Sequence, residues 1–407
     1  MPPVSLSICV ITKNESRFIE TCLQSVCKIA SEIIIVDSGS TDDTLEIAGK
    51  FSAKIFSIEW QNDYAYARNI AISKCTGHWI FFLDADEYLE NPEKILRVLS
   101  HTKNRHTGGF LMERTDMYRH KDNGLLIHYP VGMVRLFRNQ HSFKYVGAVH
   151  EQINTVITGL GFSIAILKGS RIIHQVHMSA DAFLESKQRR YLGMIEAELL
   201  KDNTNCWMQY QRAKTYWFLD EKEKAKLLFS DTANHSNCPL IIKCSCFCNK
   251  AVLLMEEGNF TEALAEVDKS LKLNPRQSQG MMIKGNIYYQ VNEFKNSIHC
   301  YRKVKTKINK LKYNEIIPGD LYVKPEEIKY KIACCYLALG KTAAAGFLVK
   351  RALHINSSHV PCLLLLAKLH ASKSNMLTAK ELTLKCLALN PGWKQAEDFL
   401  HYINTVD

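Results

Sequence analysis

The chain has 407 residues, more than the ~250–300 at which a single hydrophobic core stops growing, so a lone small module is excluded. Hydrophobic residues make up 46% and charged residues 23%, which excludes a largely disordered or collagen-like protein. The 52 Lys and Arg against 41 Asp and Glu give a net charge of +11, which over this length favours solubility; no nucleic-acid partner is expected.

The N-terminal residues run from Met-Pro-Pro-Val directly into the apolar stretch Leu6–Ile11, which predicts a strand rather than a signal peptide. No stretch approaches the ~18 apolar residues that a membrane-spanning helix needs. We therefore expect no transmembrane segment and a cytoplasmic location, with peripheral membrane contact as the alternative.

Up to Leu83, short apolar runs alternate with segments of helical periodicity. Four runs rich in Ile, Val and Phe predict strands, and the segments between them have the length of crossover helices. We expect a parallel sheet wrapped by helices, with ligands at its carboxyl edge. The predicted strands are Leu6–Ile11, Glu32–Val36, Ala53–Ile58 and His78–Leu83, and the predicted helices are Glu15–Val26, Thr41–Phe51 and Tyr64–Lys74.

From Gly108 to Ile173 the pattern changes to apolar segments separated by glycines. Two of them, Leu125–Phe137 and Phe162–Ile173, predict antiparallel strands added to the same sheet. Ala180–Leu200 has apolar residues at helical spacing and predicts a helix that links the two halves of the chain.

Beyond Asn205 the helical pattern repeats with a period of 34 residues. Small residues recur at matching positions of four units, which allows successive helical hairpins to stack into a continuous core. The segment resembles tetratricopeptide repeats; another kind of α-helical array is the alternative. The small residues are Ala251 and Ala263, Gly285 and Ser297, Ala333 and Ala345, and Ala367 and Ala379, and an earlier fifth unit has Ala213 and Ala225.

These patterns divide the chain into an α/β domain at residues 1–178, a linking helix at 179–205 and an all-α repeat domain at 206–407. The spacing between the second and third of the four repeat units exceeds the period by 14 residues, around Lys310–Lys324, and this excess predicts a protruding loop. Nine Lys and Arg residues lie between Arg302 and Lys331, which predicts either a solvated helix face or a surface that attracts phosphates and acidic polymers.

The 14 cysteines lack the spacing of a disulfide framework and predict reduced thiols. Cys244, Cys246 and Cys248 are close in sequence, and thiolates bind zinc. On a helix, however, Cys246 points away from the other two, and no partner pair follows at zinc-finger spacing, so zinc is disfavoured.

Two carboxylates directly follow the fourth predicted strand. Residues i and i+2 of an extended segment face the same side, so Asp84 and Asp86 can converge on one divalent cation, or divide between a cation and a ribose. Acidic pairs at strand ends are often ordinary turn residues, so this pair alone is a weak signal.

Polar residues also follow the other predicted strands. Thr12, Asn14 and Glu15 follow the first strand, and Asp37 ends the second, ahead of Ser40–Asp43, which have the composition of a helix cap. Arg68 lies in a helix whose amino end could face an anion, with an exposed helical ion pair as the alternative.

Four motifs occur in order: Ser7–Glu15, Val36–Asp42, Ala67–Asn69 and Asp84–Asp86. Together they resemble the inverting family-2 glycosyltransferases of the GT-A fold, over about residues 5–175. Asp63–Asn69 and Val146–Glu151 are similar to a subgroup that includes lipopolysaccharide-core glucosyltransferases and, with appended helical repeats, peptide S-glycosyltransferases that modify glycocin bacteriocins. The implied fold class is an α/β GT-A nucleotide-sugar-binding domain followed by a tetratricopeptide-repeat solenoid.

The resemblance implies a role for each of these residues. Thr12, Asn14 and Glu15 line the nucleotide pocket, Asp37 accepts a hydrogen bond from the uracil imide, Arg68 contacts the nucleotide, Asp84 lies beside ribose and metal, and Asp86 binds the Mg²⁺ or Mn²⁺ that bridges the diphosphate of the UDP-sugar donor.

The general base is less clearly indicated. Many family members carry a later acidic doublet, but within the region of resemblance no Glu-Asp pair follows Asp86, and His150 and Glu151 occupy the comparable stretch. Glu151 is our leading candidate for the base, with His150 as metal ligand or orienting partner and the two roles interchangeable. A core histidine beside a surface glutamate is the alternative. His174 and His177 are further metal candidates.

The implied function is the metal-dependent transfer of a hexose from a UDP-sugar to an acceptor, with inversion. The repeats favour an extended peptide that carries Cys or Ser/Thr, since stacked hairpins present a long groove. A saccharide acceptor, a homodimer formed through the repeats, and a binding scaffold with a vestigial nucleotide domain are the alternatives. A nucleotidyltransferase is disfavoured because no glycine-rich phosphate loop follows the first strand.

Overall fold

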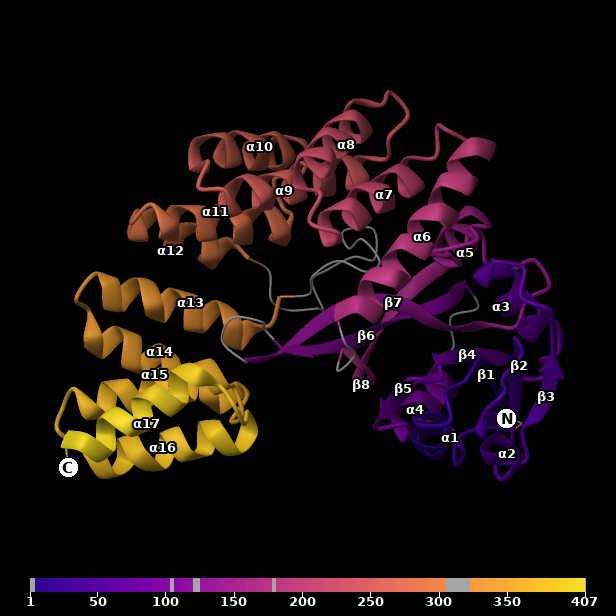
Figure 1. The fold of residues 1–407 in the computed structure, drawn as a ribbon, viewed down its shortest axis with the longest axis horizontal. Coiled ribbons are helices and arrows are strands. Elements are labelled where there is room, and N and C mark those ends of the chain that lie inside the picture. Colours follow the sequence, from indigo (N-terminus) through magenta and orange to yellow (C-terminus); the bar gives the residue numbers. More distant parts are fainter. Residues whose placement is uncertain (1–3, 103–105, 120–124, 178–180, 305–322, 407) are drawn as a thin grey trace. The chain divides into compact units, whose positions relative to one another are not determined.

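The computed structural model describes residues 4–102, 106–119, 125–177, 181–304 and 323–406 (Figure 1). These residues form two compact units. The first comprises residues 4–117 and 129–228, and the second comprises residues 118–128, 229–304 and 323–406, among the residues described.

An eight-stranded sheet has the order β3-β2-β1-β4-β7-β6-β8-β5. β1 pairs in parallel with β2 and β4, and β2 pairs in parallel with β3, whereas β7 is antiparallel to β4 and β5 is antiparallel to β8. The prediction of a parallel sheet extended by antiparallel strands is confirmed; β5 was not predicted, and no bounds were predicted for β6. The strands are β1 Leu6–Thr12, β2 Glu32–Asp37, β3 Lys54–Ser57, β4 Trp79–Asp84, β5 Glu87–Glu90, β6 Thr107–Arg119, β7 Leu126–Arg138 and β8 Ser163–His177.

Hydrophobic clusters cover both faces of the parallel part of the sheet. Along β1, Ile8 and Val10 pack with α1 on one face, whereas Cys9 packs with α3 on the other, because successive strand side chains point to opposite faces. The helices of the first unit are α1 Ile19–Val26, α2 Thr44–Gly49, α3 Tyr64–Ser73, α4 Glu93–His101, α5 Asn154–Gly159, α6 Asp181–Lys201 and α7 Cys206–Phe218, and α8 Lys222–Asn234 continues into the second unit.

Two of these helices begin later than predicted, because the loops before them bind each other. Asn14 has a positive φ of 55°, its amide donates to Ser40 Oγ (2.9 Å), and its side-chain Oδ1 accepts from the Thr41 amide (2.7 Å). The residues predicted to cap α2 therefore join the ends of β1 and β2 and shape the carboxyl edge of the sheet.

The second unit consists of paired helices with buried small residues, which confirms the predicted helical repeats. The eight small residues of the four predicted units are all buried. A Cβ atom at Gly285 would lie 2.5 Å from Cε1 of Tyr301, so only glycine fits there. The helices are α9 Leu240–Glu256, α10 Phe260–Leu273, α11 Ser278–Gln290, α12 Phe294–Lys303, α13 Pro325–Ala338, α14 Thr342–Ile355, α15 Val360–Ala371, α16 Met376–Leu389 and α17 Lys394–Val406.

The predictions for the cysteines, the loop between repeats and membrane-spanning helices can also be compared with the structure. All 14 cysteines are free thiols, and Cys244, Cys246 and Cys248 are buried along α9, where the sulfurs of Cys244 and Cys248 contact Ser270. Most of the predicted loop at Lys310–Lys324, and much of the basic segment that contains it, lies outside the described residues. In the described part of the chain, no helix is both long and apolar enough to cross a bilayer.

Candidate functional site

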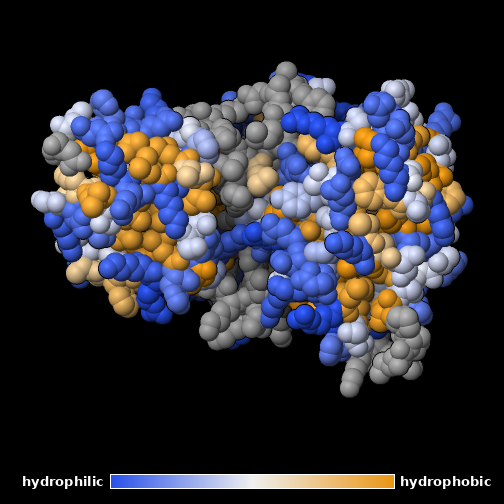
Figure 2. Space-filling view, turned by 90° about the horizontal axis from the view of Figure 1, so that it is seen from below, coloured by the Kyte–Doolittle hydropathy of each residue, from blue (hydrophilic) through white to orange (hydrophobic). Residues whose placement is uncertain are grey.

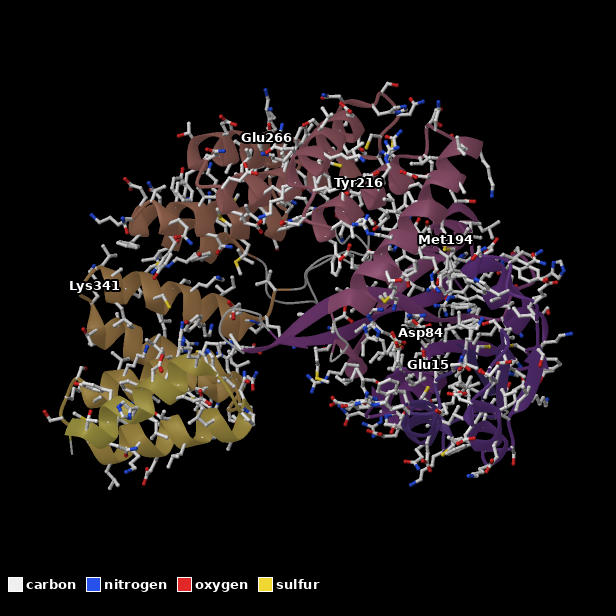
Figure 3. The ribbon with its side chains drawn as sticks, viewed as in Figure 1. Glu15, Asp84, Met194, Tyr216, Glu266 and Lys341 are labelled. Atoms are coloured by element: carbon white, nitrogen blue, oxygen red, sulfur yellow. The ribbon has the colours of Figure 1, made fainter. Side chains whose placement is uncertain are left out.

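A cavity of about 750 Å³ lies at the carboxyl ends of β1, β2 and β4, within the first unit. The parallel register brings these strand ends together, since Thr12 lies opposite Asp37 and Ile11 lies opposite Asp84. Thr12, Glu15, Asp84 and Asp86 line the cavity, and Figure 3 shows Glu15 and Asp84 at this edge of the sheet. A cavity therefore lies at the edge of the sheet where we expect ligands.

Helices α6 and α7 supply a second wall of the same cavity. Its residues are cationic, polar or aromatic, and α6 and α7 are held on the loop after β7, where Trp207 Nε1 donates to the carbonyl oxygen of His150 (3.0 Å). The cavity is therefore built by the sheet together with the first helices that follow it. The side chains of this wall include Lys187, Gln188, Arg190, Tyr191, Trp207, Gln211 and Lys214.

Arg68 joins two of the predicted site residues. Its Nε donates to Glu151 Oε1 (2.5 Å) and its Nη2 donates to Asp84 Oδ1 (2.8 Å), and its side chain is only 4% exposed. The guanidinium lies over the rings of Phe82 and Tyr145, at 5.2 and 5.4 Å from their centroids. The alternative of an exposed helical ion pair is therefore wrong for Arg68.

Asp84 is held by a second buried arginine that sequence reasoning did not identify. Arg135 Nη2 donates to Asp84 Oδ2 (2.6 Å) and Nη1 donates to Oδ1 (3.4 Å). Although burial alone raises the pKa of Asp84, Arg135 and Arg68 outweigh it and hold this pKa well below its usual range. Both carboxylate oxygens of Asp84 therefore accept from guanidinium groups.

Arg135 also contacts Glu87, which is fully buried. Its Nη2 lies 3.2 Å from Glu87 Oε1, and Glu87 Oε2 accepts from the backbone amide of Asp84 (2.9 Å). Burial raises the pKa of Glu87. Glu87 thus fixes the backbone and Arg135 fixes the carboxylate of the same aspartate.

Asp86 faces His174 on β8. His174 Nε2 lies 3.4 Å from Asp86 Oδ2, and its Nδ1 lies 3.0 Å from Asp116 Oδ1. Burial lowers the pKa of His174, but its bonds to Asp116 and Asp86 outweigh this effect and raise the pKa to about 9. At neutral pH both nitrogens of this ring are engaged by carboxylates.

A third arginine, Arg114 on β6, completes this group of charged residues. Arg114 Nη2 donates to Asp116 Oδ2 (2.9 Å), and Arg114 Nη1 lies 3.5 Å from Glu87 Oε1. Arg135 has a sequence signal, because it lies among the apolar residues of β7 and charged residues in such strands are rarely buried without a partner. Arg114 and Asp116 lie in the polar run Glu113–Asp116 and lack this signal. The contacts of Arg135 with Asp84 and Glu87, and of Asp116 with His174, join different strands, so the sequence could not pair these residues.

The predicted pair His150 and Glu151 lies in the cavity wall. His150 has a positive φ of 50°, and its Nε2 is buried without a hydrogen-bond partner among the residues that the structure describes. Burial, with a smaller effect of Lys214, lowers the pKa of His150 to about 4, so the ring is neutral at pH 7. Glu151 is 14% exposed and bound to Arg68, so it is not the surface residue of the alternative interpretation.

Glu15 lines the cavity close to Asp86. Burial, and then the negative charge of Asp86, raise the pKa of Glu15 to about 7. Its carboxyl group is therefore partly protonated at neutral pH, which makes it sensitive to any cation that enters beside Asp86.

Two predicted nucleotide contacts, Asp37 and Asn14, do not line the cavity. Asp37 is 2% exposed, and its carboxylate accepts from the amides of Gly39 and Ser40 at 3.0 Å. Asn14 binds the same loop through Thr41. Both side chains stabilise the loop that follows β2. Of the two histidines offered as metal candidates, the side chain of His177 lies outside the described residues.

Family models match two segments of the chain. Residues 7–156 match the model of glycosyl transferase family 2, and residues 245–277 match that of the tetratricopeptide repeat. Together with the described sheet and helices, these matches confirm the predicted fold class, an α/β domain of the glycosyltransferase family 2 followed by a tetratricopeptide-like helical region.

Several known proteins are similar to this chain. The SPbeta prophage-derived glycosyltransferase SunS of Bacillus subtilis (strain 168) is 31% identical over 221 residues, which is 53% of this chain and 50% of that protein. An uncharacterized glycosyltransferase of Rickettsia conorii is 43% identical over 84 residues, 21% of this chain and 29% of that protein. The chain thus spans half the length of SunS and less of the other.

The chain aligns with a structure titled as the APC/C hetero-tetramer Cut9-Hcn1 with a TM-score of 0.44 and 15% identity, over 54% of this chain and 40% of that chain.

Proposed function

Starting from the glycosyltransferase family 2 domain at residues 7–156, we propose that the chain transfers a hexose from a UDP-sugar to an acceptor, with inversion. The observation that carries this proposal is the cavity at the carboxyl edge of the parallel sheet, where Arg68 contacts both Asp84 and Glu151. Open α/β sheets bind their ligands at this edge. We propose that Thr12, Glu15 and Arg68 face the nucleotide, and that Asn14 and Asp37 shape the loops around it.

We propose that Asp86 holds Mg²⁺ or Mn²⁺. Asp84 has both oxygens bonded to arginines, whereas Asp86 contacts His174 at 3.4 Å, its one ion pair in the described part of the chain. The described residues contain no cluster of three metal-ligating side chains. This arrangement suits Mg²⁺, which is usually bound through one or two carboxylates, water and substrate phosphates. Such a cation would neutralise charge on the leaving diphosphate.

The remaining chemistry is proton removal from the acceptor. We propose Glu151 as the base, because one of its oxygens is fixed by Arg68 while the residue lines the cavity. His150 is proposed as its orienting partner or as a metal ligand, since a neutral imidazole has one ring nitrogen that can donate to a carboxylate and one that can bind a metal. A positioned base contributes typically ~10²–10⁴-fold to such a step.

For the acceptor we propose a peptide that carries Cys or Ser/Thr. The resemblance of Asp63–Asn69 and Val146–Glu151 to a subgroup that includes peptide S-glycosyltransferases, together with the long groove that stacked hairpins present, supports a peptide over a saccharide.

We propose the division into a transferase domain at 1–178, a linking helix at 179–205 and repeats at 206–407, with side chains of α6 and α7 added to the cavity wall.

A homodimer formed through the repeats is a second role that we propose for the second unit. Apolar side chains reach the surface between polar ones on the face drawn in Figure 2. Within the second unit, Phe347 is 61% exposed and Leu377 is 72% exposed. Light scattering of the purified chain would test this proposal; a monomeric mass would contradict it.

The test of the proposed activity is release of UDP from UDP-hexoses in the presence of Mn²⁺, followed by mass spectrometry of candidate peptide and saccharide acceptors. Slow UDP release and a peptide that gains one hexose are expected. A chain that neither binds nor cleaves any UDP-hexose would instead favour the scaffold interpretation.

Glu151→Gln tests the base. With a hydroxyl acceptor we expect transfer to fall by about 10²-fold or more while UDP binding is preserved. With a cysteine acceptor we expect a mild loss, because a thiol of pKa ~8.5 is already partly ionised near neutral pH. Undiminished transfer to a hydroxyl acceptor would eliminate Glu151 as base.

A further inference from the structure

Charged side chains of alternating sign form a closed ring at the floor of the cavity. Five strand or strand-end segments contribute to it, and the ring closes through the peptide of Ala85. We call this group the charged ring; its members in order are Asp84, Arg135, Glu87, Arg114, Asp116, His174 and Asp86.

The first half of the ring fixes Asp84. Arg135 grips both carboxylate oxygens and is itself held by Glu87, whose second oxygen accepts from the Asp84 amide. The side chains of Arg135 and Glu87 are 4% and 0% exposed. Side chain and backbone of Asp84 are thus oriented by the same two buried residues.

The second half of the ring fixes Asp86. Arg114 connects Glu87 to Asp116, and Asp116 connects Arg114 to His174, which contacts Asp86. Asp116 and His174 are 14% and 12% exposed, so solvent screens these pairs only weakly. The orientation of Asp86 therefore depends on Asp116 through one intervening imidazole.

Stability alone does not account for such a group. Buried ion pairs roughly balance their desolvation penalty, and well-packed apolar residues often replace them without loss. Groups that orient a functional carboxylate from behind, in contrast, typically change metal affinity or activity by 10–100-fold when they are removed. Rigid strands are also better supports for such groups than loops.

We propose that the charged ring positions Asp84 and Asp86 before any ligand binds, with Arg135 and Glu87 as positioning residues for Asp84, and Asp116 and His174 as positioning residues for Asp86. This proposal rests on the proposed function only in the identity of the ligand. The orientation itself belongs to the protein alone, so it can be tested separately.

The experiment compares the full-length wild type, Asp116→Asn and the control Glu113→Gln. Glu113 lies on the same strand as Asp116 but does not line the cavity or belong to the ring. Crystal structures give the position of Asp86, and electron paramagnetic resonance measures Mn²⁺ binding in the presence of UDP. Glu87→Gln is a second variant for the other half of the ring, to be used if it folds.

In Asp116→Asn we expect the His174 ring and the Asp86 carboxylate to be displaced, and Mn²⁺ affinity to fall about 10-fold. Glu113→Gln should leave both unchanged. An Asp86 carboxylate in its wild-type position in Asp116→Asn would overturn the proposal, even if Mn²⁺ binding were weakened, because Asp116 would then act by its charge alone.

Different results would refute the proposed function and the proposed role of the charged ring. A wild type that binds neither Mn²⁺ nor UDP would refute the metal-dependent function, while the crystal structures would still decide whether the ring orients the aspartates. Normal binding of Mn²⁺ and UDP, with Asp86 undisplaced in Asp116→Asn, would be consistent with the proposed function but would refute the proposal that the charged ring orients Asp86.

Discussion

The carboxyl edge of the sheet and the helical repeats bury opposite kinds of residue. At the sheet edge, Arg68, Arg135 and Glu87 are at most 4% exposed, and each is matched by an oppositely charged partner. In the repeats, the recurring buried positions hold Ala, Gly or Ser, such as Ala251 and Ala333 at 0%. One region buries charge, and the other buries as little side chain as possible.

This difference indicates what each region is selected for. Buried charge brings little net stability, so its presence indicates a site whose geometry matters. Small residues let helices approach closely, so they serve packing. Conservative changes of the cavity-lining carboxylates at the sheet edge should therefore lower activity, and changes at the repeat positions should lower stability.

Asp86→Asn should break the sheet-edge site. It removes the carboxylate proposed to hold the cation, while the amide keeps its size. We expect UDP release from a UDP-hexose to fall by about 10²-fold or more, as when a single charge-stabilising group is lost from an active site. Steady-state kinetics at saturating Mn²⁺ measure this.

Asp43→Asn is the control for that loss, because Asp43 is the exposed N-cap residue of α2 and makes no side-chain cap bond. Equal losses in the two variants, or full activity in Asp86→Asn, would remove Asp86 from the mechanism.

Gly285→Ala should damage the repeats and spare the site. The new Cβ would lie 2.5 Å from Cε1 of Tyr301, a ring that is 2% exposed and whose hydroxyl is bound to Asn286 (2.8 Å). The ring cannot move away freely, so we expect the second unit to lose about 1–3 kcal/mol. A lower thermal midpoint with unchanged UDP release is the expected result.

Gly346→Ala is the matched substitution, also inside a helix of the second unit. The nearest atom to its added Cβ is Leu369 Cδ1 at 3.7 Å, an ordinary contact. Since glycine is unfavourable inside a helix, this variant should gain about 0.5–1 kcal/mol. Destabilisation of both variants alike would show that the helix, rather than the contact with Tyr301, is at fault.

Glu15→Gln should change how the stability of the protein depends on pH. The folded protein holds the pKa of Glu15 at about 7, mainly through burial, above its ordinary value of 4.5. The folded state therefore binds this proton more tightly, and the wild type loses stability as pH rises from about 4.5 through 7. The glutamine variant lacks this loss.

The thermal midpoint of Glu15→Gln should accordingly exceed that of the wild type by a few degrees at pH 8 and match it near pH 4.5. Differential scanning calorimetry at several pH values measures the difference. An advantage that is the same at both pH values would mean that burial of the Glu15 charge is not its cause.

Local patterns were sufficient for most of the architecture. Strands β1 to β4 are apolar runs of strand length, and the repeats recur every 34 residues, so both can be read from neighbouring residues alone. The pair Asp84 and Asp86 was identifiable because it directly follows a buried strand. The late starts of α1 and α2 were not, since they depend on a bond between Asn14 and a loop 27 residues away.

The sequence by itself thus determined the succession of most strands and helices along the chain, the helical repeat, and the strand ends at which polar residues gather. The tertiary structure decided which charges meet: Arg135 reaches Asp84 across 51 residues, and His174 reaches Asp116 across 58. Such pairings are set by strand order and register, because they bring together side chains whose own neighbourhoods in the sequence contain no record of each other.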